Sequence, residues 1–189
     1  MHGIEAWLWN DAGQLIATER GGMLATLFAC THGGRIRLDA EAMVRPGAFQ
    51  VELSREQDTP AILRDYPLAA GRLLARMISR GVIKNAHQVG AAHRYQLSST
   101  RLERMDVLVP VGRCVDVTLA LDRGASGAEI RLIDKADGSE IALVRGPDST
   151  STRACALDRP DTLNVSAEFK TVVGESTGLV ATRMLAPRR

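Results

Sequence analysis

Apolar and polar residues alternate in short runs along the second half of the chain, from Arg101 to Met184. Alternation over about four to eight residues is typical of half-buried β-strands. Turn signals such as Asp137-Gly138 and Gly146-Pro147 separate the runs. The predicted strands are 95–98, 106–110, 114–121, 129–133, 140–144, 163–169 and 179–184. Residues 93–189 are therefore predicted to form a complete β-sandwich of antiparallel strands.

The first 54 residues show the same kind of pattern. Strands are predicted at 4–10, 15–18, 24–30, 36–42 and 49–53, and Asn10-Asp11-Ala12-Gly13 is a hairpin-type turn. One face of this segment is apolar. It carries Ile36, Leu38, Ala40, Phe49, Val51 and Leu53.

The two β-rich segments resemble each other when the first is moved along the chain by 125 positions. Seven residues in a window of 18 then coincide, and self-similarity of this kind indicates tandem units. The coinciding residues of the first segment are Gly13, Ile16, Ala17, Arg20, Gly21, Ala29 and Cys30. One-residue adjustments add matches of Glu5 with Glu129 and of Leu8 with Leu132 before the window, and of Ala40 with Ala167 and Glu41 with Glu168 after it.

The strands at 106–110 and 114–121 have no counterpart in the first segment. Residues 1–54 are therefore predicted to be a partial copy of the sandwich. Either a longer natural chain or a second chain would complete it. The open apolar face needs a cover, for which the linker helix, the complete sandwich and another chain are the candidates. Self-association is expected, because a two-fold contact between identical half-units is the simplest closure.

Residues 55–92 carry a helical pattern between the two copies. Thr59-Pro60 is a helix start, Pro67 forces a restart, and Gly81 is a C-terminal stop. We expect one face to be buried against a sheet, with the residues Leu73, Leu74, Met77 and Ile78. Arg72, Arg76 and Arg80 recur every fourth residue on another face. This arginine row is interpreted as a solvated surface, and a site for phosphate or an acidic partner is the alternative.

Residues 102–185 resemble the bacterial pre-peptidase C-terminal domain family. The similar features are Met105-Asp-Val-Leu-Val-Pro-Val-Gly112, Val115-Asp-Val-Thr-Leu119, Glu129-Ile-Arg-Leu-Ile-Asp134 with Asp137-Gly138, and Leu163-Asn-Val-Ser-Ala-Glu168. Residues 4–54 resemble the second half of the same pattern. The resemblance implies a jelly-roll-like sandwich that serves as an accessory module of exported proteins, in secretion, substrate binding or adhesion.

Cys114 and Cys155 lie at strand positions of the complete copy, and Cys30 is equivalent to Cys155. A disulfide between Cys114 and Cys155, facing each other across the sandwich, is one interpretation, and buried free cysteines are the other. The cysteine spacing does not suit a metal site.

Trp7 and Trp9 share one face of the first strand. We interpret this face as packed under the linker helix, with a protein contact or stacking on a carbohydrate as alternatives.

Other candidate chemistry is weaker. His2, His32, His87 and His93 are scattered without metal-ligand spacing. The carboxylates of Asp134, Asp137 and Glu140 are explained by a hairpin turn better than by a calcium loop. No catalytic or phosphate-binding motif occurs in the sequence, and none points to a cofactor.

The net charge of +2 gives no general argument for a nucleic-acid partner, and no apolar run is long enough to suggest membrane insertion. The predicted function is a non-catalytic accessory, structural or binding module of an exported or surface-associated bacterial protein, in the periplasm or outside the cell. The alternatives are a cytoplasmic or periplasmic assembly subunit whose half-sandwich is completed by a second chain, and an enzyme of unrecognised type.

Overall fold

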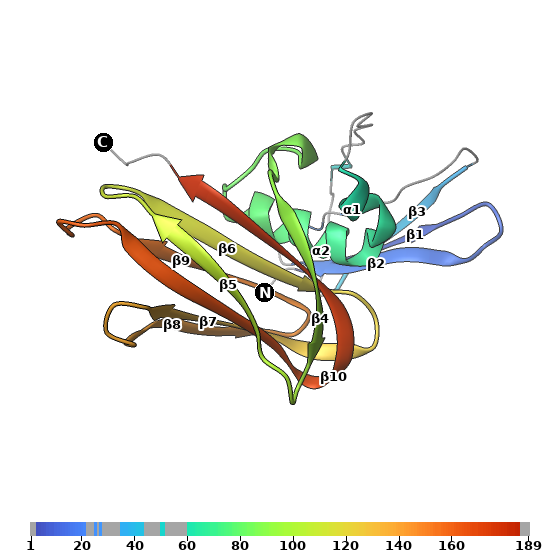
Figure 1. Cartoon of the computed structure of the whole chain (residues 1–189). Helices are drawn as coiled ribbons and strands as arrows, with labels where there is room; N and C mark the ends of the chain where they lie inside the picture. The colour runs from blue at the N-terminus through green and yellow to red at the C-terminus, as the bar shows by residue number, and fades with distance from the viewer. Residues whose placement is uncertain are drawn as a thin grey trace.

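The computed structural model describes residues 3–21, 25, 27, 35–43, 50–51 and 60–185. Two small helices separate a three-stranded sheet from a larger body of seven strands (Figure 1). The elements are β1 (Ile4–Trp9), β2 (Leu15–Gly21), β3 (Arg37–Ala42), α1 (Ala61–Asp65), α2 (Pro67–Ser79), the 3-10 helix η1 (Ala86–Gln88), β4 (Ala92–Ser98), β5 (Glu103–Val109), β6 (Cys114–Leu121), β7 (Ala125–Asp134), β8 (Glu140–Gly146), β9 (Ser149–Cys155) and β10 (Leu163–Leu185). The predicted fold class is confirmed: the chain is mainly antiparallel β, with a helical segment and a partial N-terminal copy of the sandwich.

The long strand β10 belongs to both layers of the larger body. Its first half pairs with β5 and β7, and its second half pairs with β4 and β6. The two layers are therefore β5-β10-β7-β8 and β4-β10-β6-β9. Separate strands at 163–169 and 179–184 were predicted, and this prediction is wrong because the chain stays extended where it passes between layers. Gly174 lies at this passage with a φ of 77°, where an added Cβ would be 2.6 Å from the Gly124 carbonyl oxygen.

The inner faces of the two layers form one apolar core. Phe169 is its largest side chain, and Tyr95 stacks against it with ring centroids 5.5 Å apart. β6 is buried on both faces. Its odd-numbered residues point into the core, while Asp116, Thr118 and Ala120 point outward, towards α2.

Helix α2 adds a third layer on the outer face of β6, β9 and β10. Pro67 starts the helix at its first position, as predicted. At the other end Gly81, with a φ of 66°, donates to the Ile78 carbonyl, and Val82 donates to the Met77 carbonyl. This pair of bonds is the Schellman motif, which confirms the predicted stop.

The expected apolar face of α2 is correct: Leu73, Leu74 and Met77 are buried and Ile78 is half-buried. One detail of the helical segment differs from the prediction. Pro60 lies at the N-cap of α1 and not at its first helical position; Thr59 lies outside the described residues.

The polar strand β9 was not among the predicted strand ranges, although Cys155 at its end was placed at a strand position. Its sequence, Ser-Thr-Ser-Thr-Arg-Ala-Cys, has almost no apolar residue to alternate. It is buried between α2 and the core nevertheless, with Thr150, Ser151 and Thr152 all inaccessible or nearly so. β-Branched threonine fits a pleated strand, and its hydroxyl hides the pattern that reveals other strands.

The three N-terminal strands, called here the partial unit, repeat β7, β8 and β10 of the larger body, called the complete unit. β1 pairs with β2 and β3 just as β7 pairs with β8 and β10. Glu5 stands opposite Arg20 as Glu129 stands opposite Arg145, and both ladders shift register at the same place, after Leu8 and after Leu132. The repeat seen in the sequence is thus present in the pairing of the strands. The matches of Ala40 with Ala167 and of Glu41 with Glu168 are wrong, because Leu38 and Asp39 take the equivalent places opposite β1. The predicted strands at 24–30 and 49–53 lie largely outside the described residues.

Candidate functional site

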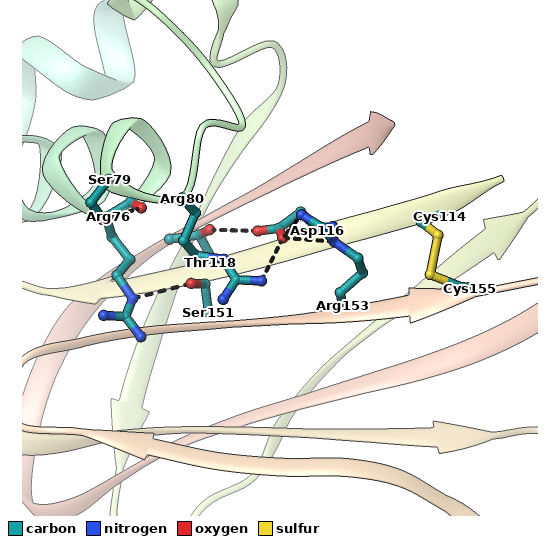
Figure 2. A network of polar contacts seen from close by, with 9 residues as sticks. All are labelled: Arg76, Ser79, Arg80, Cys114, Asp116, Thr118, Ser151, Arg153 and Cys155. Carbon is teal, nitrogen blue, oxygen red and sulfur yellow. Dashed lines mark hydrogen bonds and ion pairs between the residues drawn. A yellow bond between two sulfur atoms is a disulfide. The ribbon is translucent and has the colours of Figure 1, made fainter. Parts of the chain in front are cut away.

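The arginine row is formed by Arg72, Arg76 and Arg80 of α2, which packs on β6 and β9. Figure 2 shows Arg76 and Arg80 between the helix and these two strands. Arg80 Nη2 is 2.9 Å from Asp116 Oδ2, and Arg76 Nε donates to Ser151 Oγ at 3.1 Å. Arg153, the residue opposite Asp116 on β9, contacts the same carboxylate oxygen at 3.2 Å. The prediction of a solvated helix face is therefore wrong for Arg72 and Arg76, which are partly buried because β6 and β9 present polar partners where the helix docks. Arg80 is exposed, although its guanidinium reaches Asp116.

The spacing of the row matches the spacing of the strands. Four residues of helix advance about 6 Å, and two residues of strand advance about 6.6 Å. Successive arginines therefore reach successive pairs of the β6–β9 ladder: Asp116 with Arg153, then Thr118 with Ser151. Asp116 itself is fully buried, and a buried carboxylate needs such cationic partners.

Arg72 ends the row at the junction with the partial unit. Its Nη1 donates to the Leu121 carbonyl at 2.8 Å, and its Nη2 is 3.1 Å from Asp148 Oδ2. Glu19 of β2 interacts with Asp148 and Arg72. Burial and the negative charge of Asp148 raise the pKa of Glu19 to about 7, although the positive charge of Arg72 opposes the shift. The junction thus holds two carboxylates beside one guanidinium.

Cys114 and Cys155 form a disulfide with Cα atoms 4.0 Å apart. The pair is the one expected from the sequence, but its place differs. The cysteines are directly opposite each other on the neighbouring strands β6 and β9 of one layer, so the bridge does not cross the sandwich. It lies on the outer face, next to the Asp116–Arg153 pair (Figure 2). Cys30 lies outside the described residues.

Trp7 and Trp9 share one face of β1, as predicted, and both are half-buried. Arg37 of β3 lies over the Trp9 ring at 5.2 Å from its centroid. Glu19 stands opposite Ala6, on the other face of the sheet, and it is the residue that is coupled to Arg72 of α2. The tryptophans therefore lie on the face of the sheet that is turned away from Arg72. The expectation that the tryptophan face packs under the helix is wrong.

β3 is an edge strand. Within the described residues it pairs only with β1 (Figure 1). Leu38 of β3 is opposite Leu8, and the equivalent residue Ala167 is opposite Leu132. Ala167, however, is also paired with Met105 of β5 on its other side. The partial unit thus keeps the edge on which the complete unit carries β5.

The acidic loop is a hairpin turn, as interpreted. Asp134 is buried, accepts a bond from the Ala136 N–H and pairs with Arg159. A bond from Ser139 lowers the pKa of Asp137. Glu140 is paired with Arg131 across the hairpin. These carboxylates already have partners within the chain.

Two of the four candidate histidines lie in the described residues: His87 is in η1, and His93 is exposed in β4. His2 and His32 lie outside the described residues. In the described part of the chain, no helix has the length and apolar character needed to cross a membrane.

Several residues of these sites were missed from the sequence. Asp116 interrupts the apolar run 115–121 and so carried a signal, because a charge on a strand buried on both faces needs a partner. Arg153, Asp148 and Glu19 carried none, since their roles depend on segments distant in sequence.

Comparison with known proteins shows little. No protein-family model matches the chain, and no curated protein matches it. Among solved structures, a de novo designed double-stranded β-helix is similar at 13% identity, over 50% of this chain and 99% of that one, with a TM-score of 0.32. The Drosophila NLP core, described with pentamer formation and histone binding, covers 50% of this chain and 98% of its own at 11% identity and a TM-score of 0.28. A Bacillus endospore appendage protein of disulfide-linked pili covers 55% of this chain and 98% of its own, at 14% identity and a TM-score of 0.21.

Proposed function

We propose that this chain is a non-catalytic structural module of an exported or surface-associated bacterial protein, and that it joins other protein segments through the partial unit. One observation carries the proposal: the partial unit repeats the pairing of β7, β8 and β10 residue for residue, yet among the residues that the structure describes no strand pairs with the edge of β3 that corresponds to the β5-bearing edge of β10. Open edges are sites of strand addition.

The remaining polar features support a structural role. The arginine row fastens α2 to the complete unit, so the charged residues that looked available for a ligand are used inside the fold. The Cys114–Cys155 disulfide supports the exported location, because such bridges persist in oxidising compartments.

A peptide with the sequence 101–110, which contains β5, is a direct probe of strand addition. Fluorescence anisotropy of the labelled peptide should show saturable binding to the chain, and the Leu38 and Ala40 amides should become protected from hydrogen exchange. The same peptide with proline at the positions of Met105 and Val107 is the matched control, because proline cannot donate to a strand ladder. Absence of binding, together with fast exchange of both amides at every protein concentration, would contradict the proposed function.

A further inference from the structure

We propose that the occupant of the β3 edge is β3 of a second copy, paired antiparallel about a two-fold axis through Leu38. This deepens the proposed function and rests on it. The result is a continuous sheet in the order β2-β1-β3-β3-β1-β2, built from the partial units of two chains.

The backbone of β3 is oriented for this pairing. The Met43 N–H donates to the Gly3 carbonyl at 2.8 Å, so position 43 forms a hydrogen-bonded pair with β1. Such pairs alternate along an antiparallel ladder, so the odd-numbered residues of β3 face β1. The N–H and C=O groups of Ile36, Leu38 and Ala40 therefore point to the open edge, where they can bond to the same groups of a second copy.

The side chains from Arg35 to Glu41 are self-complementary about Leu38. The sequence is Arg-Ile-Arg-Leu-Asp-Ala-Glu. In the proposed register Arg35 lies opposite Glu41 of the second copy, and Arg37 lies opposite its Asp39. On the other face Ile36 lies opposite Ala40, and Leu38 lies opposite Leu38. No like charges meet, and every directly opposed pair is either oppositely charged or apolar.

Other registers lose this complementarity. Moving the axis to Asp39 places the two Asp39 carboxylates opposite each other, and moving it to Ala40 places Asp39 opposite Glu41. Like charges directly opposite are destabilising in antiparallel sheets. Charge complementarity therefore selects the axis at Leu38.

The complete unit already contains the same arrangement within one chain. Glu168 of β10 is paired with Arg104 of β5, with 2.9 Å between Arg104 Nε and Glu168 Oε1. Asp39 is the equivalent of Glu168, because each follows the residue that stands opposite the leucine common to both units, Leu8 or Leu132. In the proposed dimer Arg37 of the second copy takes the place of Arg104. Among the described residues of the single chain, Arg37 contacts Asp39, with 3.2 Å between Arg37 Nη2 and Asp39 Oδ2, and the ring of Trp9.

Reversing the charge of Arg37, of Asp39, and of both together tests the pairing. Sedimentation velocity of the whole chain over a range of concentrations should show a monomer–dimer equilibrium. Arg37→Glu or Asp39→Arg alone should raise the dissociation constant about tenfold or more, because each change creates two like-charge pairs across the axis. The double variant R37E/D39R should recover to within about threefold of the unmodified chain, and an equimolar mixture of the two single variants should form a heterodimer.

Two further variants guard against misfolding. Leu38→Pro removes an outward-pointing donor that the β1 ladder does not use, and it should abolish the dimer while circular dichroism stays unchanged. Arg113→Glu makes the same charge change at an exposed turn of the complete unit and should leave the dimer intact. A dimer indifferent to both single reversals, or a double variant that fails to recover, would overturn the inference.

The outcome also separates this inference from the proposed function. A chain that stays monomeric at about 100 µM but binds the 101–110 peptide with protection of Leu38 and Ala40 has a receptive edge and no self-pairing, so only the inference falls. A monomer that also fails to bind the peptide removes both.

Discussion

The partial and complete units share strand order and register but fill their apolar faces differently. In the complete unit Ile130 stands opposite Phe169, and both are fully buried. At the equivalent place in the partial unit Ala6 stands opposite Ala40. The shared pairing therefore does not depend on side-chain bulk. It follows features common to both units, namely the turn glycine with positive φ and the cross-strand glutamate–arginine pair.

Bulk matters instead for closing a second layer. Ile130 and Phe169 meet the layer formed by β4, β10, β6 and β9, and they bring a large apolar area out of water. Ala6 and Ala40 bury a much smaller apolar area, so this pair cannot contribute to a sandwich core of the same size. A strand at its edge and a helix against β2 offer stabilisation that the small core does not.

Leucine truncation at equivalent positions should separate the two units most strongly. Leu132→Ala should lower the free energy of unfolding by about 3–5 kcal/mol, because Leu132 is fully buried in the sandwich core. Leu8→Ala should cost about 2 kcal/mol, because Leu8 retains 8% exposure in a thinner core. Urea unfolding of the two variants measures this difference. Equal costs would show that the partial unit is as tightly packed as the complete one.

Removal of the disulfide should act on the complete unit alone. The bridge joins residues 41 positions apart, and bridges of this kind stabilise by about 2–4 kcal/mol. The double variant C114S/C155S should lose this amount in thermal unfolding. Cys30→Ser is the matched control: the chain has three cysteines, so the bridge leaves Cys30 no cysteine in its own chain. A comparable loss in Cys30→Ser would point to a bridge between chains through the partial unit.

Removing a carboxylate should also cost more stability in the complete unit than in the partial unit. Asp116→Ala should cost about 2–3 kcal/mol, because Asp116 is fully buried and its loss leaves Arg80 and Arg153 without their shared partner. Glu5→Ala removes the more exposed pair with Arg20 and should cost less than about 1 kcal/mol. Chemical denaturation at low and high salt checks both values. A cost for Glu5 as large as that for Asp116 would show that the cross-strand pair contributes more to register than its exposure suggests.

The sequence predicted most of the strands and the repeat because both depend on local alternation and turn chemistry. β6 was predicted with its observed bounds, and the repeat was found from turn glycines and neighbouring residues that lie at equal positions in the two ladders. Helix α2 was predicted from its proline start and glycine stop. These signals all lie within a few residues of the element that they define.

The environment of charged residues could not be predicted in the same way. The arginine row has the sequence pattern of a solvent-exposed helix face. Only the docking of α2 on β6 and β9 shows that Asp116 and Ser151 contact these arginines. β9 escaped for a related reason, since its threonines and serines are buried without an apolar pattern. The family resemblance of residues 102–185 stays a prediction, because none of the comparisons tests it.

The junction between the two units should respond to pH in a direction set by Glu19. Burial beside Asp148 raises the pKa of Glu19 to about 7 from its ordinary 4.5, so the folded chain holds a proton that the unfolded chain releases. Below about pH 4.5 the carboxyl is protonated in both states, and the fold is not penalised. As the pH rises from 4.5 to 7 the unfolded chain is stabilised by ionisation of Glu19, and the fold loses stability until Glu19 is ionised in both states.

Because Glu19 is only partly buried and lies beside Arg72, this loss of stability should be smaller than the losses expected for the leucine, disulfide and Asp116 variants. The free energy of unfolding of Glu19→Gln minus that of the unmodified chain should therefore rise across this window. Asp11→Asn, at an exposed acid of the turn between β1 and β2, serves as the control. A flat difference between pH 4.5 and 8 would show that Glu19 does not carry a buried proton and that the two units are not coupled through it.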